Sequence, residues 1–232
     1  MCGICGEVHF AGHEEGRQGV EAMLQRLLHR GPDGQWMRGD ERAVFGMARL
    51  TIRGLTSGQQ PLVDEATGVM VVCNGEIDNH LELRSFLAER GRPVTEDTDV
   101  AVLPGLYLEL GQSFVERLVG AFAIAVWDPR NATLFLARDR AGERPLFFSR
   151  ADGMVFFASQ LSAMVKGGDH PSSPDVEVLA RYLQLGYFPS PDSPLDDVFK
   201  VGPGEWVVLS AESTERHRYW QLPKRQPSGG TD

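Results

Sequence analysis

The sequence predicts an α+β protein in which antiparallel sheets are layered with helices. Two observations lead to this prediction: helical patterns come in pairs, and many short apolar runs follow one another in hairpin succession. The 232 residues are 42% hydrophobic and 24% charged, which suffices for one large domain with a real core. No internal repeat is visible.

The strand-like runs are short and rich in Val, Phe and Ile. Gly, Pro, Asp or Asn bound most of them, as expected for strands that end in turns. The predicted strands are residues 4–10, 43–50, 69–74, 121–127, 133–138, 145–148, 154–158 and 205–209.

Four helical patterns are predicted between these runs. The first carries apolar residues at the 3.6 period, namely Val20, Met23, Leu24, Leu27 and Leu28. The second has Leu83, Phe86 and Leu87 on one face and Gly91 as a stop signal.

The third and fourth helices each have a candidate N-cap. Thr98 precedes a face made of Leu103, Leu106, Tyr107 and Leu110, and Pro104-Gly105 is expected to kink or shorten this helix. Asp175 precedes a face that we expect to point inward, made of Val178, Leu179, Tyr182 and Leu183.

The charge balance argues against a nucleic-acid or anionic-membrane partner. The formal net charge is −9, the pI is near 5.2, and no basic run occurs. The N-terminus lacks the pattern of a signal peptide, and the longest apolar run, 121–127, is too short to span a bilayer. Three cysteines do not make a disulfide framework. We therefore expect a cytoplasmic protein without membrane or nucleic-acid partners.

Cys2 places a thiol at the second position of the chain. Methionine is normally trimmed before a small residue, and Cys2 would then carry a thiol and a free α-amine that serves as its general base. The usual pKa is about 8.5 for a thiol and about 7.7–8.0 for an α-amine. Moving the proton from sulfur to nitrogen therefore costs roughly 1 kcal/mol. Position alone favours the alternative, in which Cys2 is only an early residue of a buried strand.

An ordered set of motifs decides between these interpretations. They are MCGICGE at 1–7, HRGPDG at 29–34, ARLTI at 48–52, QQPL at 59–62, NGEIDNH at 74–80, DTDV at 97–100, GAFAIAVWD at 120–128 and LFLARDRAGERPLFF at 134–148. This order and spacing resemble the class II glutamine amidotransferase domain of the asparagine synthetase family, over residues 1 to about 220. The resemblance implies an N-terminal-nucleophile hydrolase fold, an αββα four-layer sandwich with two antiparallel sheets between helices.

Asn74 and Gly75 are the predicted catalytic partners of Cys2. Acyl transfer needs donors aimed at the developing oxyanion, and this pair offers a side-chain amide and a backbone N–H. Glycine also allows the backbone to approach a substrate closely. Because N-G is also a hairpin signal, a strand-ending turn is the alternative. The accompanying motifs favour catalysis.

Arg49, Glu76 and Asp99 are the predicted substrate-binding residues. An arginine can clamp a carboxylate bidentately, and Arg49 interrupts an apolar run instead of following one. The resemblance places Arg49 on the α-carboxylate of glutamine, Asp99 on its α-ammonium, and Glu76 in the same acidic pocket. A plain surface charge is the alternative for Arg49.

Other motifs are weaker signals. Cys2 and Cys5 form a C-x-x-C pattern that suits a redox or zinc site, but no second pair follows, so we expect no metal. Cys73 is expected to be an inert core thiol. The 29–34 loop terminates a helix, and the resemblance implies that it closes over the nucleophile. Asp78 stands where the family usually has tyrosine.

The resulting hypothesis is a glutaminase domain at 1–222, followed by a flexible tail or linker at 223–232. The resemblance implies hydrolysis of L-glutamine to glutamate and ammonia, with a C-terminal or separate synthetase domain as partner. ATP and Mg²⁺ would belong to that domain; this chain is expected to need no cofactor, since SGGTD at 228–232 lacks the strand and helix of a nucleotide site. The alternatives are an inactive regulatory module and an N-terminal-cysteine amidase acting on another amide.

Overall fold

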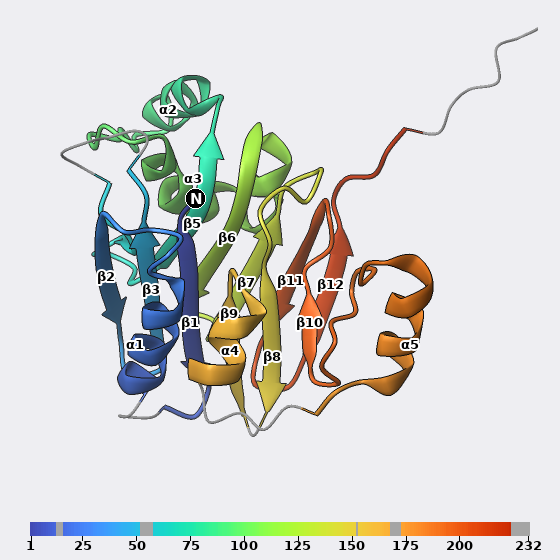
Figure 1. Ribbon diagram of the computed structural model, residues 1–232. Helices are drawn as coiled ribbons and strands as arrows, with labels where there is room; N and C mark the ends of the chain where they lie inside the picture. The colour runs from blue at the N-terminus through green and yellow to red at the C-terminus, as the bar shows by residue number, and fades with distance from the viewer. Residues whose placement is uncertain (13–15, 52–57, 152, 168–172, 224–232) are drawn as a thin grey trace, which may run out of the picture.

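The computed structural model describes residues 1–12, 16–51, 58–151, 153–167 and 173–223. Within them, two six-stranded antiparallel sheets lie face to face between two helical layers (Figure 1). The predicted α+β sandwich with αββα layering is confirmed. The predicted tail lies, except for Pro223, outside the described residues.

The first sheet carries the N-terminus in its middle. Its strand order is β10 (Val198–Lys200), β8 (Phe147–Ala151), β9 (Met154–Ala158), β1 (Gly3–His9), β3 (Ala43–Arg49) and β2 (Gly34–Gly39). Every residue of β1 is buried because both faces of this sheet are covered. At Gly6 a Cβ atom would lie 2.4 Å from the ring of Phe157 and 2.7 Å from that of Phe45, so only glycine fits between these two rings.

The second sheet has the order β12 (Thr214–Arg218), β11 (Glu205–Leu209), β7 (Thr133–Arg138), β6 (Gly120–Asp128), β5 (Met70–Ile77) and β4 (Leu62–Val63). Its inner face and that of the first sheet form one core, with Ile4, Phe45 and Trp127 among its buried residues. This core fixes how β1 lies against β5, and the two strands bring Cys2 and Asn74 to the same end of the sandwich.

Helices cover the outer faces of both sheets. α1 (Gly16–Leu27) and α4 (Leu161–Gly167) pack on the first sheet, with Val20, Met23, Leu24 and Leu27 buried as predicted. Leu28 lies beyond the helix and is 38% exposed, so its predicted place on the apolar face is wrong. α2 (His80–Ala88), α3 (Val102–Leu110) and two 3₁₀ turns, η1 (Asp99–Ala101) and η2 (Gly111–Arg117), cover the second sheet.

The third helix begins later than its predicted N-cap suggests. Thr98 precedes η1 and makes no side-chain cap hydrogen bond, and α3 begins only at Val102. Pro104 therefore falls in the first turn, where its missing N–H has no helical partner to lose. The helix continues through Pro104-Gly105 and ends at Leu110.

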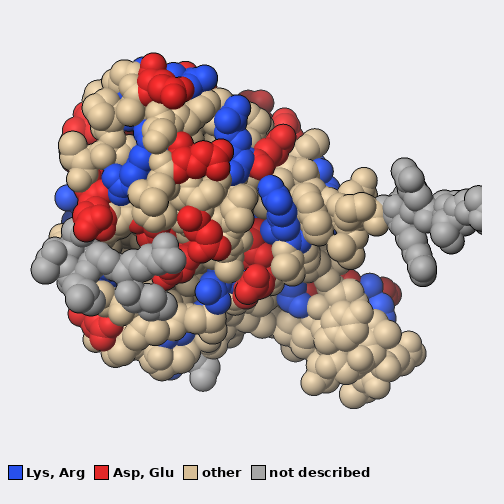
Figure 2. Space-filling view, turned by 90° about the horizontal axis from the view of Figure 1, so that it is seen from above, with Lys and Arg blue, Asp and Glu red and all other residues tan. Residues whose placement is uncertain are grey.

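The fourth predicted helix is α5 (Val176–Leu185), and its predicted orientation is largely wrong. Asp175 caps it as expected, accepting hydrogen bonds from the N–H groups of Glu177 and Val178. However, Leu183 is 84% exposed, and Val178 is the buried residue of the helix. Most of its apolar stripe therefore faces outward. Figure 2 shows this part of the molecule as a largely uncharged projection.

In the part of the chain that the structure describes, no helix has both the length and the hydropathy required to cross a bilayer.

Candidate functional site

A small cavity brings most of the predicted site residues together. It has a volume of about 40 Å³ and is lined by Cys2, Arg49, Gly75, Glu76 and Asp99, among others. These residues come from the position just before β1, the end of β3, the end of β5 and the start of η1. Residues far apart in the sequence thus meet at one end of the sandwich.

The thiol of Cys2 lies against the backbone that follows β3. The N–H of Leu50 donates to Cys2 Sγ at 3.4 Å, and the thiol lies 3.5 Å from the Leu50 carbonyl oxygen. The sulfur of Cys2 therefore contacts both the backbone donor and the backbone acceptor of the same residue. Cys2 is half-buried, whereas Met1 before it is 52% exposed.

Arg30 is a site residue for which the sequence analysis gave no role. Its Nε donates a 2.9 Å hydrogen bond to the carbonyl oxygen of Cys2, and only 9% of Arg30 is exposed. Burial and the nearby Arg144 lower the pKa of Arg30, while the charge of Cys2 opposes this shift. The HRGPDG motif contains Arg30, and the resemblance implied that its loop closes over the nucleophile, but no role was predicted for Arg30 itself.

The rest of this loop packs on the end of β3. A Cβ atom on Gly31 would lie 2.2 Å from the Ala48 carbonyl carbon and oxygen, so the backbone of the loop touches that of the strand. Asp33 accepts a hydrogen bond from the N–H of Thr51 at 2.7 Å. These contacts fix the chain on both sides of Arg49 and Leu50.

Asn74 lies beside the cavity and is not among its lining residues. It is 1% exposed, and its Nδ2 donates to Ser159 Oγ at 3.4 Å. Ser159 Oγ also accepts from the N–H of Ile4 at 3.0 Å, which links Asn74 to β1 just after Cys2. An amide nitrogen has two N–H donors, and among the described residues only one of them has an acceptor.

Gly75 does line the cavity, and the alternative of a strand-ending turn is wrong. β5 continues through Asn74 and Gly75 to Ile77, in register with β6. A Cβ atom on Gly75 would lie 2.1 Å from the carbonyl oxygen of Ala121. Glycine is therefore required here by the close approach of β5 to β6.

The predicted charge clamp is buried. Arg49 is 8% exposed and Asp99 is 6% exposed. Asp99 Oδ2 accepts a 2.7 Å hydrogen bond from the N–H of Ile77, which fixes the carboxylate against β5. Gly58, with φ of +91°, lies so close to Arg49 that a Cβ atom would be 2.9 Å from Nη2. Backbone thus lies against each of the two charged groups near the cavity.

The pKa of the Cys73 thiol is shifted by its burial and by the charges around the cavity. Burial, followed by the negative charges of Asp99, Cys2 and Glu76, raises the pKa of its thiol well above the usual range. Cys73 is 1% exposed, so it stays a neutral thiol, in agreement with the predicted inert role. Burial likewise raises the pKa of Cys5, whose thiol points towards α1 and lies 3.9 Å from the Val20 carbonyl oxygen.

Gln60 completes the edge of the second sheet beside the cavity. Its Oε1 accepts from the N–H of Cys73 at 2.6 Å, and its Nε2 donates to the Cys73 carbonyl oxygen at 3.2 Å. The side chain thus replaces a strand neighbour beyond the two-residue β4. The QQPL motif signalled this residue without indicating its role.

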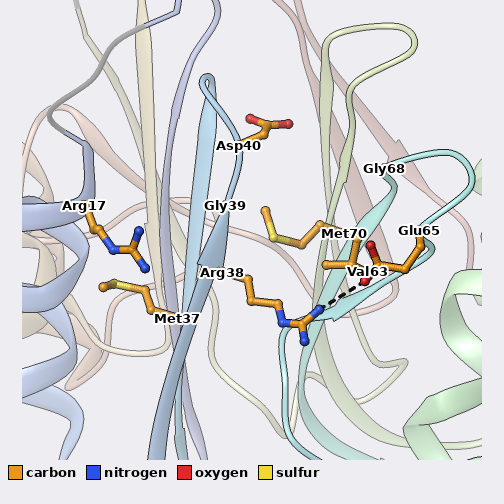
Figure 3. Close-up of a pocket in the computed structure, with 9 residues that line it drawn as sticks. All are labelled: Arg17, Met37, Arg38, Gly39, Asp40, Val63, Glu65, Gly68 and Met70. Carbon is orange, nitrogen blue, oxygen red and sulfur yellow. Dashed lines mark hydrogen bonds and ion pairs between the residues drawn. The ribbon is translucent and has the colours of Figure 1, made fainter.

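A larger cavity of about 390 Å³ opens between the edge strands β2 and β4 (Figure 3). Arg38 and Glu65 face each other across it with 3.5 Å between Nη1 and Oε1. Asp40 accepts a 2.7 Å hydrogen bond from the indole N–H of Trp127. None of its lining residues is a predicted site residue or carries a thiol, so the small cavity is the candidate site.

Comparisons with known proteins identify the family of the chain. A family model described as "Glutamine amidotransferase domain" matches residues 1–220. Asparagine synthetase [glutamine-hydrolyzing] 3 of Bacillus subtilis is 30% identical over 236 residues, which cover 100% of this chain and 38% of that protein. Asparagine synthetase [glutamine-hydrolyzing] 1 of the same organism is 34% identical over 213 residues, 90% of this chain and 33% of that protein. The amidase chry2 of Gibberella zeae is 30% identical and covers 96% of this chain.

Solved structures show the same fold. The glutamine phosphoribosylpyrophosphate amidotransferase of B. subtilis matches with a TM-score of 0.67 and 20% identity, over 95% of this chain and 50% of that one. A structure titled as the allosteric regulatory enzyme of purine biosynthesis matches with a TM-score of 0.72 and 20% identity, over 97% of this chain and 50% of that one. The chain spans little more than a third, at most, of the two B. subtilis synthetases.

Proposed function

The chain belongs to the glutamine amidotransferase domain family, and from this premise we propose that it hydrolyses L-glutamine to glutamate and ammonia through a thioester on Cys2. The observation that carries the proposal is the cavity that joins a half-buried thiol to a buried arginine and a buried aspartate. A free amino acid carries a carboxylate and an ammonium group on its α-carbon, and these match the arginine and the aspartate.

The proposed reaction begins after removal of Met1. The α-amine of Cys2 accepts the thiol proton, and the thiolate attacks the side-chain amide carbon of glutamine. The amide nitrogen leaves as ammonia after taking the proton back from the amine, and a γ-glutamyl thioester remains. Water, deprotonated by the same amine, then hydrolyses the thioester to glutamate and restores the thiol.

The neighbours of Cys2 suit the charges of this reaction. The N–H of Leu50 donates to the sulfur of Cys2 and holds it at the cavity. We assign the oxyanion to the free N–H of the Asn74 amide and the backbone N–H of Gly75. Asn74 is preorganised for this role because Ser159 holds its other N–H.

We assign substrate recognition to the buried charges. Arg49 pairs with the α-carboxylate and Asp99 with the α-ammonium, and Glu76 adds to the negative potential. A cavity of about 40 Å³ holds a few water molecules but not glutamine, so its walls separate when the substrate enters.

The released ammonia is proposed to serve a synthetase domain, fused or separate, that uses ATP and Mg²⁺. Curated relatives are named asparagine synthetases, so aspartate is the proposed acceptor substrate of that partner. A cytoplasmic location, where thiols stay reduced, fits this chemistry.

The test uses the purified chain with the mass of its mature N-terminus verified. We expect glutamate and ammonia from glutamine, and a mass increase of one γ-glutamyl group on the peptide that begins with Cys2 after acid quenching. Cys2→Ala is the control and should lose both signals. Activity with Met1 retained would contradict the N-terminal-nucleophile mechanism.

One relative favours a second candidate function, since the Gibberella zeae protein is named an amidase. Under this alternative the same thiol attacks another amide, and the charge clamp has no part in recognition. Faster cleavage of simple primary amides than of glutamine would support it.

A further inference from the structure

Arg84 of α2 holds the segment that leads into the cavity. Its Nη1 donates a 3.1 Å hydrogen bond to the carbonyl oxygen of Val94, and its Nη2 donates a 2.6 Å hydrogen bond to that of Thr98. Nη2 also donates to the carbonyl oxygen of Glu96. One planar guanidinium thus binds three carbonyls from five consecutive residues, a geometry that lysine cannot reproduce.

The segment needs such an anchor because residues 92–98 form neither helix nor strand. Thr98 directly precedes Asp99, so the hydrogen bond from Arg84 fixes the peptide from which the carboxylate projects. From the other side, the N–H of Ile77 binds Asp99 Oδ2 at 2.7 Å. Asp99 is therefore positioned between β5 and the guanidinium of Arg84, although Arg84 itself does not line the cavity.

We propose that Arg84 is a positioning residue for recognition of the substrate α-ammonium, acting through Thr98 and Asp99. The inference rests on the proposed hydrolysis of glutamine and deepens it. A buried carboxylate pairs with an ammonium only when it sits at the correct place, and a displacement of about 1 Å can reduce a rate about 100-fold. Loss of Arg84 therefore weakens recognition of the amine and spares the thiol chemistry.

The test compares two substrates that differ only in the amine. Glutamine carries the α-ammonium, and glutaramate has the same amide and carboxylate without it. In Arg84→Gln we expect the ratio of kcat/KM for glutamine over glutaramate to fall about 10- to 100-fold. The loss should lie in KM for glutamine, while kcat/KM for glutaramate stays nearly unchanged. Arg84→Lys should lie between this variant and the wild type.

Arg90 provides the matched control. It lies just beyond α2, its Nη1 donates to the carbonyl oxygen of Phe86, and its Nε lies 3.5 Å from Glu109 Oε1, away from the 94–98 segment. Arg90→Gln removes the same charge and should leave the substrate ratio unchanged. Equal losses on both substrates in Arg84→Gln, or an unchanged ratio, would show that Arg84 only stabilises the fold.

A double-mutant cycle tests the route through Asp99. In an Asp99→Asn background, Arg84→Gln should not lower the ratio further. Fully additive effects would overturn the proposal. If the wild type hydrolyses neither substrate, the proposed function is wrong, but the role of Arg84 can still be tested. The ratio of Kd values for glutamine and glutaramate, measured by calorimetry, then replaces the ratio of kcat/KM values. If Arg84→Gln does not fold, the ratio in Arg84→Lys decides, and an unchanged value contradicts the proposal.

Discussion

The guanidinium of Arg30 donates a 2.9 Å hydrogen bond to the backbone carbonyl of Cys2. Arg30 follows α1, so the end of this helix is tied to the residue that carries the proposed nucleophile. The hydrogen bond acts on the backbone of Cys2, and therefore on the direction in which both its thiol and its α-amine point. A residue outside the cavity thus contributes to the geometry of the reaction.

Arg30→Gln should lower kcat for glutamine hydrolysis by about tenfold or more. The reason is that a hydrogen bond from a charged donor contributes about 1.5–3 kcal/mol, and here it orients the nucleophile. Steady-state kinetics on the mature protein measures the effect. Arg26→Gln, in the exposed last turn of α1, is the control and should leave kcat unchanged. Unchanged kcat in Arg30→Gln would mean that Cys2 is oriented without it.

Most of the central strands could be predicted from the sequence because they are buried on both faces. The runs at 121–127 and 133–138 coincide closely with β6 and β7. The edge strands β2, β4, β10 and β12 were missed. β12, for example, is exposed along its whole length and reads TERHR, which has no apolar period. At an edge, backbone pairing forms the strand without help from side-chain burial.

In the candidate site, too, some residues could be predicted from the sequence and others could not. Sequence motifs identified Cys2, Arg49, Gly75, Glu76 and Asp99 as candidates for one site, and these residues line one cavity. Their roles remain predictions. The supporting residues could not be assigned roles in this way. Arg30 and Gln60 act on backbone atoms of distant segments, and a backbone partner leaves no trace in the sequence.

The orientation of α5 could not be predicted for a different reason. Its apolar stripe correctly indicates an amphipathic helix, and Asp175 correctly marks its start. Periodicity identifies the apolar face of a helix but not what lies opposite it. Leu183 is therefore exposed despite its place in the stripe.

Asn74→Ala should lower kcat for glutamine by about 10²–10³, the usual effect of removing one preorganised oxyanion donor. Ser159→Ala separates catalysis from structure. It leaves the N–H of Ile4 without this acceptor, so the free energy of unfolding should fall by about 1–3 kcal/mol, while kcat falls less than in Asn74→Ala. Urea unfolding and initial rates measure the two effects. Near-normal kcat in Asn74→Ala would assign Asn74 a purely structural role.

Arg49→Ala and Asp99→Ala should each raise KM for glutamine by about 100-fold or more. Removing one partner of a buried charge pair costs about 3–5 kcal/mol because the substrate charge is left unpaired. Arg42→Ala, in the exposed hairpin between β2 and β3, should leave KM unchanged. Unaltered KM in both cavity variants would instead support the amidase alternative.

The stability of the fold should depend on pH through Asp128. Burial alone would raise the pKa of this carboxyl, but two 2.8 Å hydrogen bonds from Arg130 outweigh it, and the pKa is lowered. A lowered pKa stabilises the folded state above the ordinary value of about 3.9, and this contribution is lost as pH falls through the folded pKa.

Arg130→Gln should therefore lower the unfolding free energy at pH 7 and lower it by less at pH 2, because the Asp128 carboxylate takes up its proton as the pH falls through its lowered pKa. Urea titrations at the two pH values measure this. Arg38→Gln, which breaks the exposed pair with Glu65, should change little at either pH. An equal loss in Arg130→Gln at both pH values would show that packing, not charge, accounts for its effect.

The final prediction concerns the products that the 232-residue chain makes in the presence of glutamine, aspartate, ATP and Mg²⁺. Adenylation of aspartate requires a phosphate-binding loop between a strand and a helix, and the candidate cavity instead combines a thiol with charges suited to an amino acid. The SGGTD sequence at 228–232 lies outside the described residues and was predicted not to form such a loop. We therefore expect glutamate and ammonia in equal amounts and no asparagine, as measured by amino-acid analysis. Adding a synthetase domain should then convert part of the ammonia into asparagine. Asparagine or AMP formed by the chain without a partner would overturn both the assigned function and the interpretation of that tail.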